Sequence, residues 1–187
     1  MKKILVASLF VLATSFSLFA QKSSSDKLDI FGGYSFTRFN PGQGADAVNQ
    51  NGWESMATFR MTPKFGLTAD VDGTYKTESG ATNHIYTYMF GPEIKMGNDK
   101  GSAFFHGLAG FAHESVTANL LGTNFSVSDN AFATAFGGGY DWRASDAISI
   151  RLFQADYLIT RFGSATQNNI RLAFGVTFHP KFGGRGL

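Results

Sequence analysis

The chain has 187 residues with 22 glycines, 20 phenylalanines and no cysteine, and 16 lysines and arginines stand against 14 aspartates and glutamates. The lack of cysteine excludes a disulfide framework, a thiol nucleophile and a lipid-anchored cysteine. The near-balanced charge, with no basic cluster, argues against nucleic acid as a partner. Abundant glycine and phenylalanine fit short strands with tight turns better than helices.

Residues 1–20 have the pattern of a secretory signal peptide. Two lysines precede the apolar run 4–13, and small and hydroxyl residues lead to Ala20. The apolar run is short for a transmembrane helix, which needs ~20 residues. We therefore expect cleavage after Ala20, which leaves one mature domain over residues 21–187 with 14 basic and 14 acidic residues.

The mature chain alternates apolar and polar residues in stretches of about ten residues, as transmembrane β-strands do. We expect eight strands over residues 28–39, 53–61, 65–75, 85–96, 103–116, 131–143, 148–159 and 170–178. The clearest stretch places Leu67, Ala69 and Val71 on one face, and Asp70 and Asp72 on the other. Such a strand can show one face to lipid and the other to a polar interior.

Two strands need closer attention. In the fifth, Phe105, Ala109 and Phe111 share the face that we assign to lipid. In the seventh, an unbroken alternation would place Gln154 and Asp156 in lipid, so we predict a β-bulge near Phe153 that turns both inward.

The connections between the expected strands alternate in length. The short ones are residues 62–64, 97–101 and 144–146, and the longer ones are 40–52, 76–84, 117–130 and 160–169. Short periplasmic turns and longer outer loops are typical of outer-membrane barrels, and an even strand number places both mature ends in the periplasm.

Aromatic residues gather toward both ends of the expected strands. Tyr34, Trp53 and Tyr86 lie toward the long loops, whereas Tyr140 and Trp142 lie toward the short turns. Two such belts are favoured at the two membrane interfaces. A soluble barrel with the faces reversed would show the same alternation, but the signal peptide, the loop asymmetry and the belts favour the membrane. We therefore predict an all-β fold, an eight-stranded antiparallel up-and-down transmembrane β-barrel.

Three segments carry a family resemblance: residues 29–35, 151–157 and the closing 171–178. The chain resembles the small outer-membrane β-barrel domain family, which includes the OmpA-type transmembrane barrel and the OmpX-type short barrel. The resemblance implies a Gram-negative outer membrane, contact with its lipid, and insertion by the barrel-assembly machinery. It implies no catalytic activity.

Charged residues collect on the expected inward face. Besides Asp29, they form what we term the interior charge network: Glu54, Arg60, Asp70, Asp72, Glu93, Lys95, Asp141, Arg143, Arg151 and Arg171. Eight strands leave an interior that side chains fill, and an isolated buried charge is costly. We expect these residues to pair and plug the barrel, with Asp70 or Asp72 reaching an arginine on a neighbouring strand. A narrow porin-like channel is the alternative.

No catalytic or metal-binding motif stands out. His113 and Glu114 are adjacent, so in a strand they point to opposite faces. Gly137–Gly139 lacks the Lys-Ser/Thr of a phosphate loop. We predict no enzyme activity, no cofactor and no metal site; a lipid- or peptide-acting barrel enzyme, with a triad drawn from several strands, is the third hypothesis.

The third long connection is the candidate functional loop. Val116, Ala118 and Leu120 alternate before it, and Phe125 and Val127 after it, which predicts that the strands continue above the membrane as a hairpin. A protruding edge can add a strand from a partner. The candidate partner-binding residues are Leu120, Leu121, Phe125 and Val127. We therefore predict a structural or surface-interaction role, with a surface protein or matrix as partner; an ordinary outer loop is the alternative.

Overall fold

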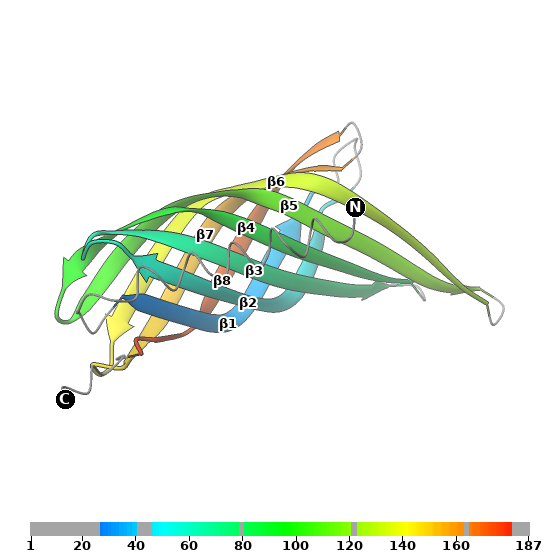
Figure 1. Ribbon diagram of the computed structural model, residues 1–187. Coiled ribbons are helices and arrows are strands. Elements are labelled where there is room, and N and C mark those ends of the chain that lie inside the picture. The colour runs from blue at the N-terminus through cyan, green and yellow to red at the C-terminus, as the bar shows by residue number, and fades with distance from the viewer. Residues whose placement is uncertain (1–26, 41–45, 79–80, 121–122, 163–164, 181–187) are drawn as a thin grey trace, which may run out of the picture. The chain divides into compact units, whose positions relative to one another are not determined.

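In the computed structural model, residues 27–40, 46–78, 81–120, 123–162 and 165–180 are described. The predicted signal peptide lies outside them. They form a closed barrel in which each strand pairs with its neighbours in the chain (Figure 1). The strands are β1 (Leu28–Phe39), β2 (Val48–Arg60), β3 (Phe65–Glu78), β4 (Ala81–Asn98), β5 (Gly101–Leu120), β6 (Thr123–Arg143), β7 (Ile148–Phe162) and β8 (Ala165–Phe178). The predicted eight-stranded antiparallel barrel is confirmed.

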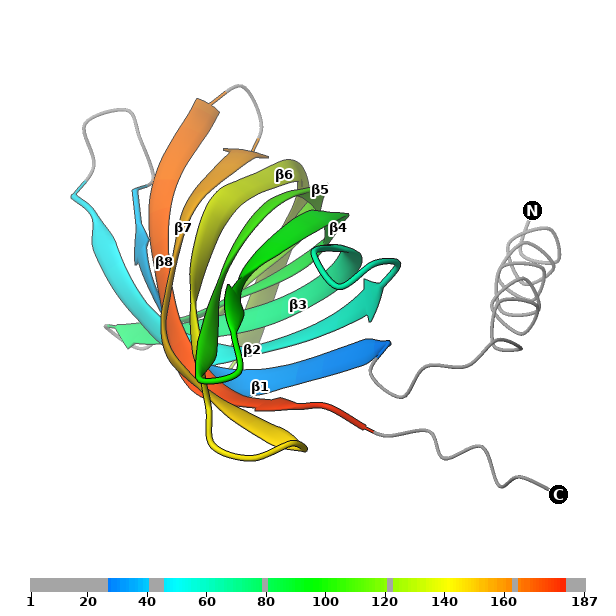
Figure 2. The same cartoon turned by 90° about the vertical axis from the view of Figure 1, so that its left-hand side faces the viewer.

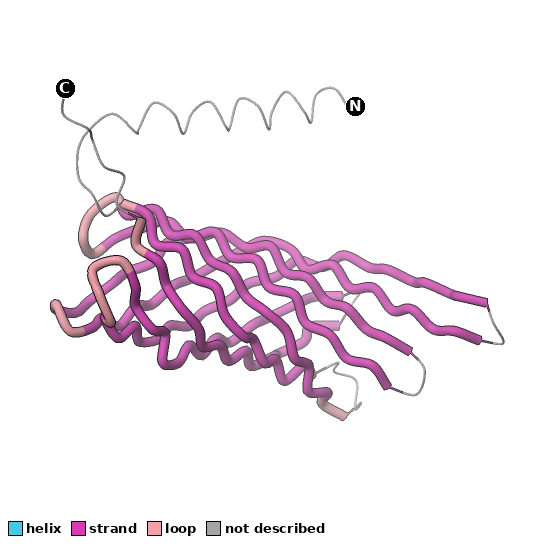
Figure 3. The backbone as a smooth tube through the Cα atoms, turned by 90° about the horizontal axis from the view of Figure 1, so that it is seen from below, coloured by secondary structure: helices cyan, strands magenta, loops and turns pink. Residues whose placement is uncertain are grey.

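The barrel closes where β1 pairs antiparallel with β8, from Ile30 opposite Phe178 to Arg38 opposite Ile170. Figure 2 shows the strands around a common interior, and Figure 3 shows the backbone as a tube, with the tilted strands joined by short loops at one end. Among the described residues, none belongs to a helix long and apolar enough to cross a membrane.

The strands are longer than the sequence predicted at the long-loop end. The connection expected over residues 76–84 is almost wholly strand, because β3 continues to Glu78 and pairs with Ala81 of β4. β5 and β6 reach 20 and 21 residues, which confirms their predicted continuation as a hairpin. The predicted ends of β3 and β4 lie where apolar alternation stops. That rule fails outside a membrane, because polar residues in water can continue the same backbone ladder.

The assignment of faces is confirmed along the wall. In β5, Phe105 is 56% exposed and faces outward, whereas Leu108 is 1% exposed and faces inward. In β3, Asp70 and Asp72 are buried inside. The period of two in side-chain direction therefore carries from sequence to structure without a slip in these strands.

The predicted bulge in β7 is confirmed. The register between β7 and β8 shifts between Arg151 and Gln154. Leu152 and Phe153 consequently both face outward, while Gln154 and Asp156 are buried in the interior. The bulge thus keeps a carboxylate out of the outer face, as bulges that redirect side chains do.

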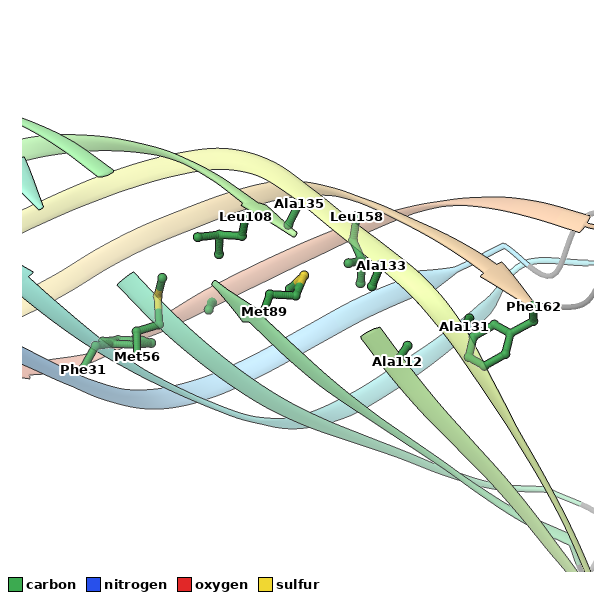
Figure 4. Packing of buried hydrophobic residues seen from close by; sticks show 11 residues of the cluster. Phe31, Met56, Met89, Leu108, Ala112, Ala131, Ala133, Ala135, Leu158 and Phe162 are labelled. Carbon is green, nitrogen blue, oxygen red and sulfur yellow. The ribbon is translucent and has the colours of Figure 1, made fainter. Parts of the chain in front are cut away.

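The interior also contains an apolar cluster, which the sequence analysis did not anticipate (Figure 4). Its members are Phe31, Met56, Met89, Leu108, Ala112, Ala131, Ala133, Ala135, Leu158, Phe162 and Ala173. Most of them come from β4 to β7. The interior is therefore filled partly by ion pairs and partly by apolar packing.

Candidate functional site

The interior charge network begins near the short turns. Asp29 on β1 accepts a hydrogen bond from Arg60 Nε at 2.8 Å and lies 3.2 Å from Lys95 Nζ. Arg60 also pairs with Glu93 on β4. His179, just after β8, places Nδ1 2.7 Å from Asp29 and Nε2 2.8 Å from the Ser149 hydroxyl. Four strands and the residue just after β8 are thus linked at this end of the barrel.

Arg151 forms the next level. Its guanidinium donates to both carboxylate oxygens of Asp141, at 2.8 and 3.2 Å. It also lies 4.1 Å and 4.0 Å from the ring centres of Phe31 and Phe104, in cation–π geometry. A third contact runs from its Nη1 to Gln154 Oε1 at 2.6 Å. The cation is therefore fixed between a carboxylate and two apolar walls.

Arg171 on β8 is the centre of the network and is fully buried. Its Nη2 lies 2.7 Å from Asp70, 2.7 Å from Asp156 and 3.2 Å from Glu54. Asp156 also lies 2.9 Å from His106 Nε2. One guanidinium therefore bridges carboxylates from β2, β3 and β7, which ties opposite sides of the barrel together.

The prediction that Asp70 pairs with an arginine is confirmed, but the predicted position of that arginine on a neighbouring strand is wrong. Asp70 reaches an arginine, but Arg171 belongs to β8, across the interior, whereas β3 has β2 and β4 as neighbours. Asp72 lies directly opposite Glu54 and forms no ion pair with another described residue. Arg143 is half-buried near the short turns and likewise has no ion-pair partner in the described part of the chain.

Sequence reasoning missed four members of these clusters: His106, Gln154, Asp156 and His179. His106 could have been assigned to the interior from the alternation of β5, because it shares a face with Leu108. The next two follow the predicted bulge. His179 occupies the next inward position after Thr177 of β8, beyond the expected strand end.

The interior side chains stabilise the barrel by linking its strands through ion pairs and hydrogen bonds. In the described part of the chain, no group of three or more His, Cys, Asp or Glu residues could hold a metal ion. His106 Nδ1 has no hydrogen-bond partner there, so no described nucleophile is linked to the His106–Asp156 pair. The connected side chains instead fill the interior from wall to wall.

The second candidate site is the β5–β6 hairpin, which projects past the other strands (Figure 1). Pairing of β5 with β6 continues to Leu120 opposite Thr123, but β6 pairs with β7 only from Phe132 onward. Residues 123–131 of β6 therefore have one unpaired edge within the described chain. Leu121 and the side chain of Leu120 lie outside the described residues.

The apolar residues of the hairpin are on the opposite face from those of the wall. Phe125 is 55% and Val127 73% exposed, and both share the face of the interior residue Ala131. They lie opposite Ala118 and Val116 of β5. The outward face of the same stretch of β6 carries Ser126, Ser128 and Asn130, all exposed. Below the apolar pairs, on the same face as Phe125 and Val127, Glu114 lies directly opposite Asp129.

No family model matches the chain, and no curated protein matches its sequence. Several solved structures of other proteins do match the fold of this chain. The attachment invasion locus protein Ail of Yersinia pestis is 19% identical with a TM-score of 0.62, over 83% of this chain and 100% of Ail. The fold is that of a small outer-membrane β-barrel.

Two further structures support this likeness. Neisserial surface protein A is 10% identical with a TM-score of 0.62, over 84% of this chain and 99% of its own. The N-terminal β-barrel domain of Pseudomonas aeruginosa OprF is 10% identical with a TM-score of 0.50, over 83% and 98%. The resemblance to small outer-membrane barrels is therefore confirmed for the fold.

Proposed function

We propose that the protein is an outer-membrane barrel that presents the β5–β6 hairpin to a polypeptide partner outside the cell. The location is supported by the fold and by the exposed wall. Phe90, Phe136 and Phe174, on β4, β6 and β8, are each more than half exposed. Apolar surface of this extent suits lipid, because soluble monomers rarely expose large contiguous apolar patches.

The orientation follows from the loops. The short turns face the periplasm, together with both ends of the mature chain, and the hairpin faces outward. Cleavage of residues 1–20 and insertion by the barrel-assembly machinery belong to the same proposal. The filled interior gives the barrel a structural role, as a rigid support for the hairpin.

The unpaired edge of β6 carries the proposal. An extended segment of a partner can hydrogen-bond to residues 123–131 and extend the sheet. Its apolar side chains would cover Phe125 and Val127. Like charges directly opposite one another destabilise a sheet, so the Glu114–Asp129 pair favours a segment that also carries a lysine or arginine.

The charge of the hairpin also favours a peptide partner over a sulfated sugar. Ail has been solved in complex with the heparin analogue sucrose octasulfate. The stretch 113–130 of the present chain contains Glu114 and Asp129 but no lysine or arginine. A polyanion would therefore meet repulsion at this hairpin, whereas a basic, apolar peptide segment would meet complementary charge.

Site-specific photocrosslinking in intact cells tests this function. A photoreactive phenylalanine at Ser128, on the unpaired stretch of β6, should form adducts with a polypeptide. The control is the same group at Asn168, an exposed residue of β8. Changing Val127 to lysine should abolish the adduct at Ser128, because it removes apolar contact and adds repulsion to the basic partner. Equal adducts at both positions would contradict the proposal.

A further inference from the structure

The short-turn end of the interior contains a serine, a histidine and an aspartate in one hydrogen-bonded chain. Ser149 Oγ lies 2.8 Å from Nε2 of His179, and Nδ1 of the same ring lies 2.7 Å from Asp29 Oδ1. The three residues come from β7, the segment just after β8, and β1. This order is that of a nucleophile, a general base and the carboxylate that orients the base. A triad drawn from several strands is what the third hypothesis from the sequence required.

The backbone register brings these residues together. The β1–β8 pairing places Asp29 across from His179, one step beyond its last pair. The His179 amide donates to the Ala147 carbonyl at 2.8 Å, so the ladder between β7 and β8 continues past the end of β8. This bond holds the imidazole beside Ser149, two residues after Ala147. The triad is therefore positioned by paired backbone.

The cations around Asp29 determine how the imidazole is protonated. Arg60 Nε and Lys95 Nζ lie 2.8 and 3.2 Å from its other carboxylate oxygen. Two such cations favour the ionised carboxylate, which can only accept hydrogen bonds. Nδ1 of His179 therefore donates to Asp29. In the neutral imidazole, Nε2 is then the acceptor for the Ser149 hydroxyl, as a general base requires.

Two donors flank the serine, one on each neighbouring strand. Thr177 of β8 pairs with Ser149, and its buried hydroxyl has no hydrogen-bond partner among the described residues. Arg143 of β6 stands at the inward position directly opposite Ser149. Opposite residues in a sheet have Cβ atoms about 4.5–5.5 Å apart, so both can reach an oxygen bound beside Ser149 Oγ. A buried hydroxyl without a partner is unfavourable in a purely structural network, whereas an oxyanion would satisfy it.

The position of the triad limits the substrate. Ser149 is the second residue of β7 and His179 directly follows β8, so the triad lies at the mouth of the barrel. Its members are 5–8% exposed. Arg151 closes the next layer, two residues or about 7 Å further along β7, where Asp141 and two phenylalanine rings hold it. Only a short acyl group fits between Ser149 and Arg151, with the alcohol part of an ester directed outward.

We propose that this triad hydrolyses short-chain carboxylic esters that enter at the short-turn end of the barrel. Ser149 Oγ bonds to the ester carbonyl carbon while its proton passes to His179 Nε2. The bond to the alcohol oxygen breaks, and the alcohol takes that proton. Water then attacks the acyl carbon and gives a proton to His179; the acyl–Oγ bond breaks as the proton returns to Ser149, and the carboxylic acid leaves. Arg143 and Thr177 stabilise the oxyanion, and Asp29 is a positioning residue.

Hydrolysis of p-nitrophenyl acetate by the refolded full barrel tests the site. Ser149→Ala should lower kcat/KM about a hundredfold, and adding His179→Gln should cost no more, because members of one catalytic unit are not additive. The matched control is Ser102→Ala, a half-buried serine at the same end of β5, which should leave kcat/KM unchanged. Asp29→Asn and Arg143→Gln should lower kcat at unchanged KM. Rates are expressed per folded molecule, from tryptophan emission.

A fluorophosphonate gives a readout that needs no variant, because it phosphonylates an activated serine. Peptide mass spectrometry of the folded wild type should find the adduct on Ser149 and not on Ser102. A folded barrel without an adduct on Ser149, or hydrolysis that persists in Ser149→Ala, would overturn the proposal. Both assays use the purified barrel without a partner, so their failure leaves the proposed role of the hairpin untouched.

Discussion

Replacing Arg171 with methionine removes the cation at the centre of the barrel while keeping an unbranched side chain of similar reach. Asp156 would keep its contact with His106, and Glu54 its hydrogen bond from Gln154. Asp70 has no other hydrogen-bond or ion-pair partner among the described residues. It would become a buried carboxylate without compensation.

The size of the effect follows from that single orphaned charge. Breaking a buried ion pair by removing one partner costs about 3–5 kcal/mol. We therefore expect Arg171→Met to lower the free energy of unfolding by about 4 kcal/mol, a large part of the ~5–15 kcal/mol typical of a folded protein. Arg143→Met is the control, because Arg143 is half-buried and has no ion-pair partner in the described chain. It should change stability by less than about 0.5 kcal/mol.

Urea unfolding in lipid vesicles, followed by the emission of Trp53 and Trp142, gives these free energies. Adding Asp70→Asn to Arg171→Met should recover about 1–3 kcal/mol, since it removes the uncompensated charge. A loss below about 1 kcal/mol for Arg171→Met, or no recovery in the double variant, would show that ion pairing at Arg171 does not hold the interior together.

Three further outcomes are expected. Val71→Arg should cost about 2–4 kcal/mol in vesicle folding assays because it puts a cation in lipid, whereas Asp72→Asn should be tolerated; equal effects would overturn the assignment of faces. Deleting Phe153 removes the extra residue of the bulge and leaves a regular alternation in which Asp156 still faces inward, so the fraction that folds should be largely retained; a sharp loss of folding would mean that the strand needs the bulge itself. In planar bilayers the protein should give at most small, infrequent conductance steps, and sustained large-pore conductance would favour the channel.

The sequence determined the faces of the strands because a period of two leaves only two choices, and one of them puts Asp70 and Asp72 in lipid. The bulge was predictable for the same reason. Partners across the interior were not. Arg171 and Asp70 meet only after β1 closes on β8 and the strands stagger, which no local pattern records.

Strand ends were harder to read than strand faces. The β5–β6 extension could be predicted because Val116 and Val127 continue an alternation. The β3–β4 extension could not, since Thr77 and Thr82 pair in a stretch that is polar on both faces. The apolar cluster was missed for a related reason: alanine on an inward position reads as a small spacer, and only packing against Leu158 shows it to be part of a core.

The apolar residues of the hairpin lie on the opposite face from those of the wall, and this helps to decide whether the hairpin is an ordinary loop. In the wall, lipid accounts for outward apolar residues. Above it, water reaches both faces, so the bilayer gives no reason for Phe125 and Val127 to be apolar. The hairpin is also supported, because β4 continues beside β5 to the pair Ala81–Ala118. An isolated two-stranded ribbon is only marginally stable in water, whereas a third strand holds the edge of β6 in an extended conformation before a partner arrives. Such preorganisation lowers the entropic cost of strand addition, which favours a docking element over a mobile loop.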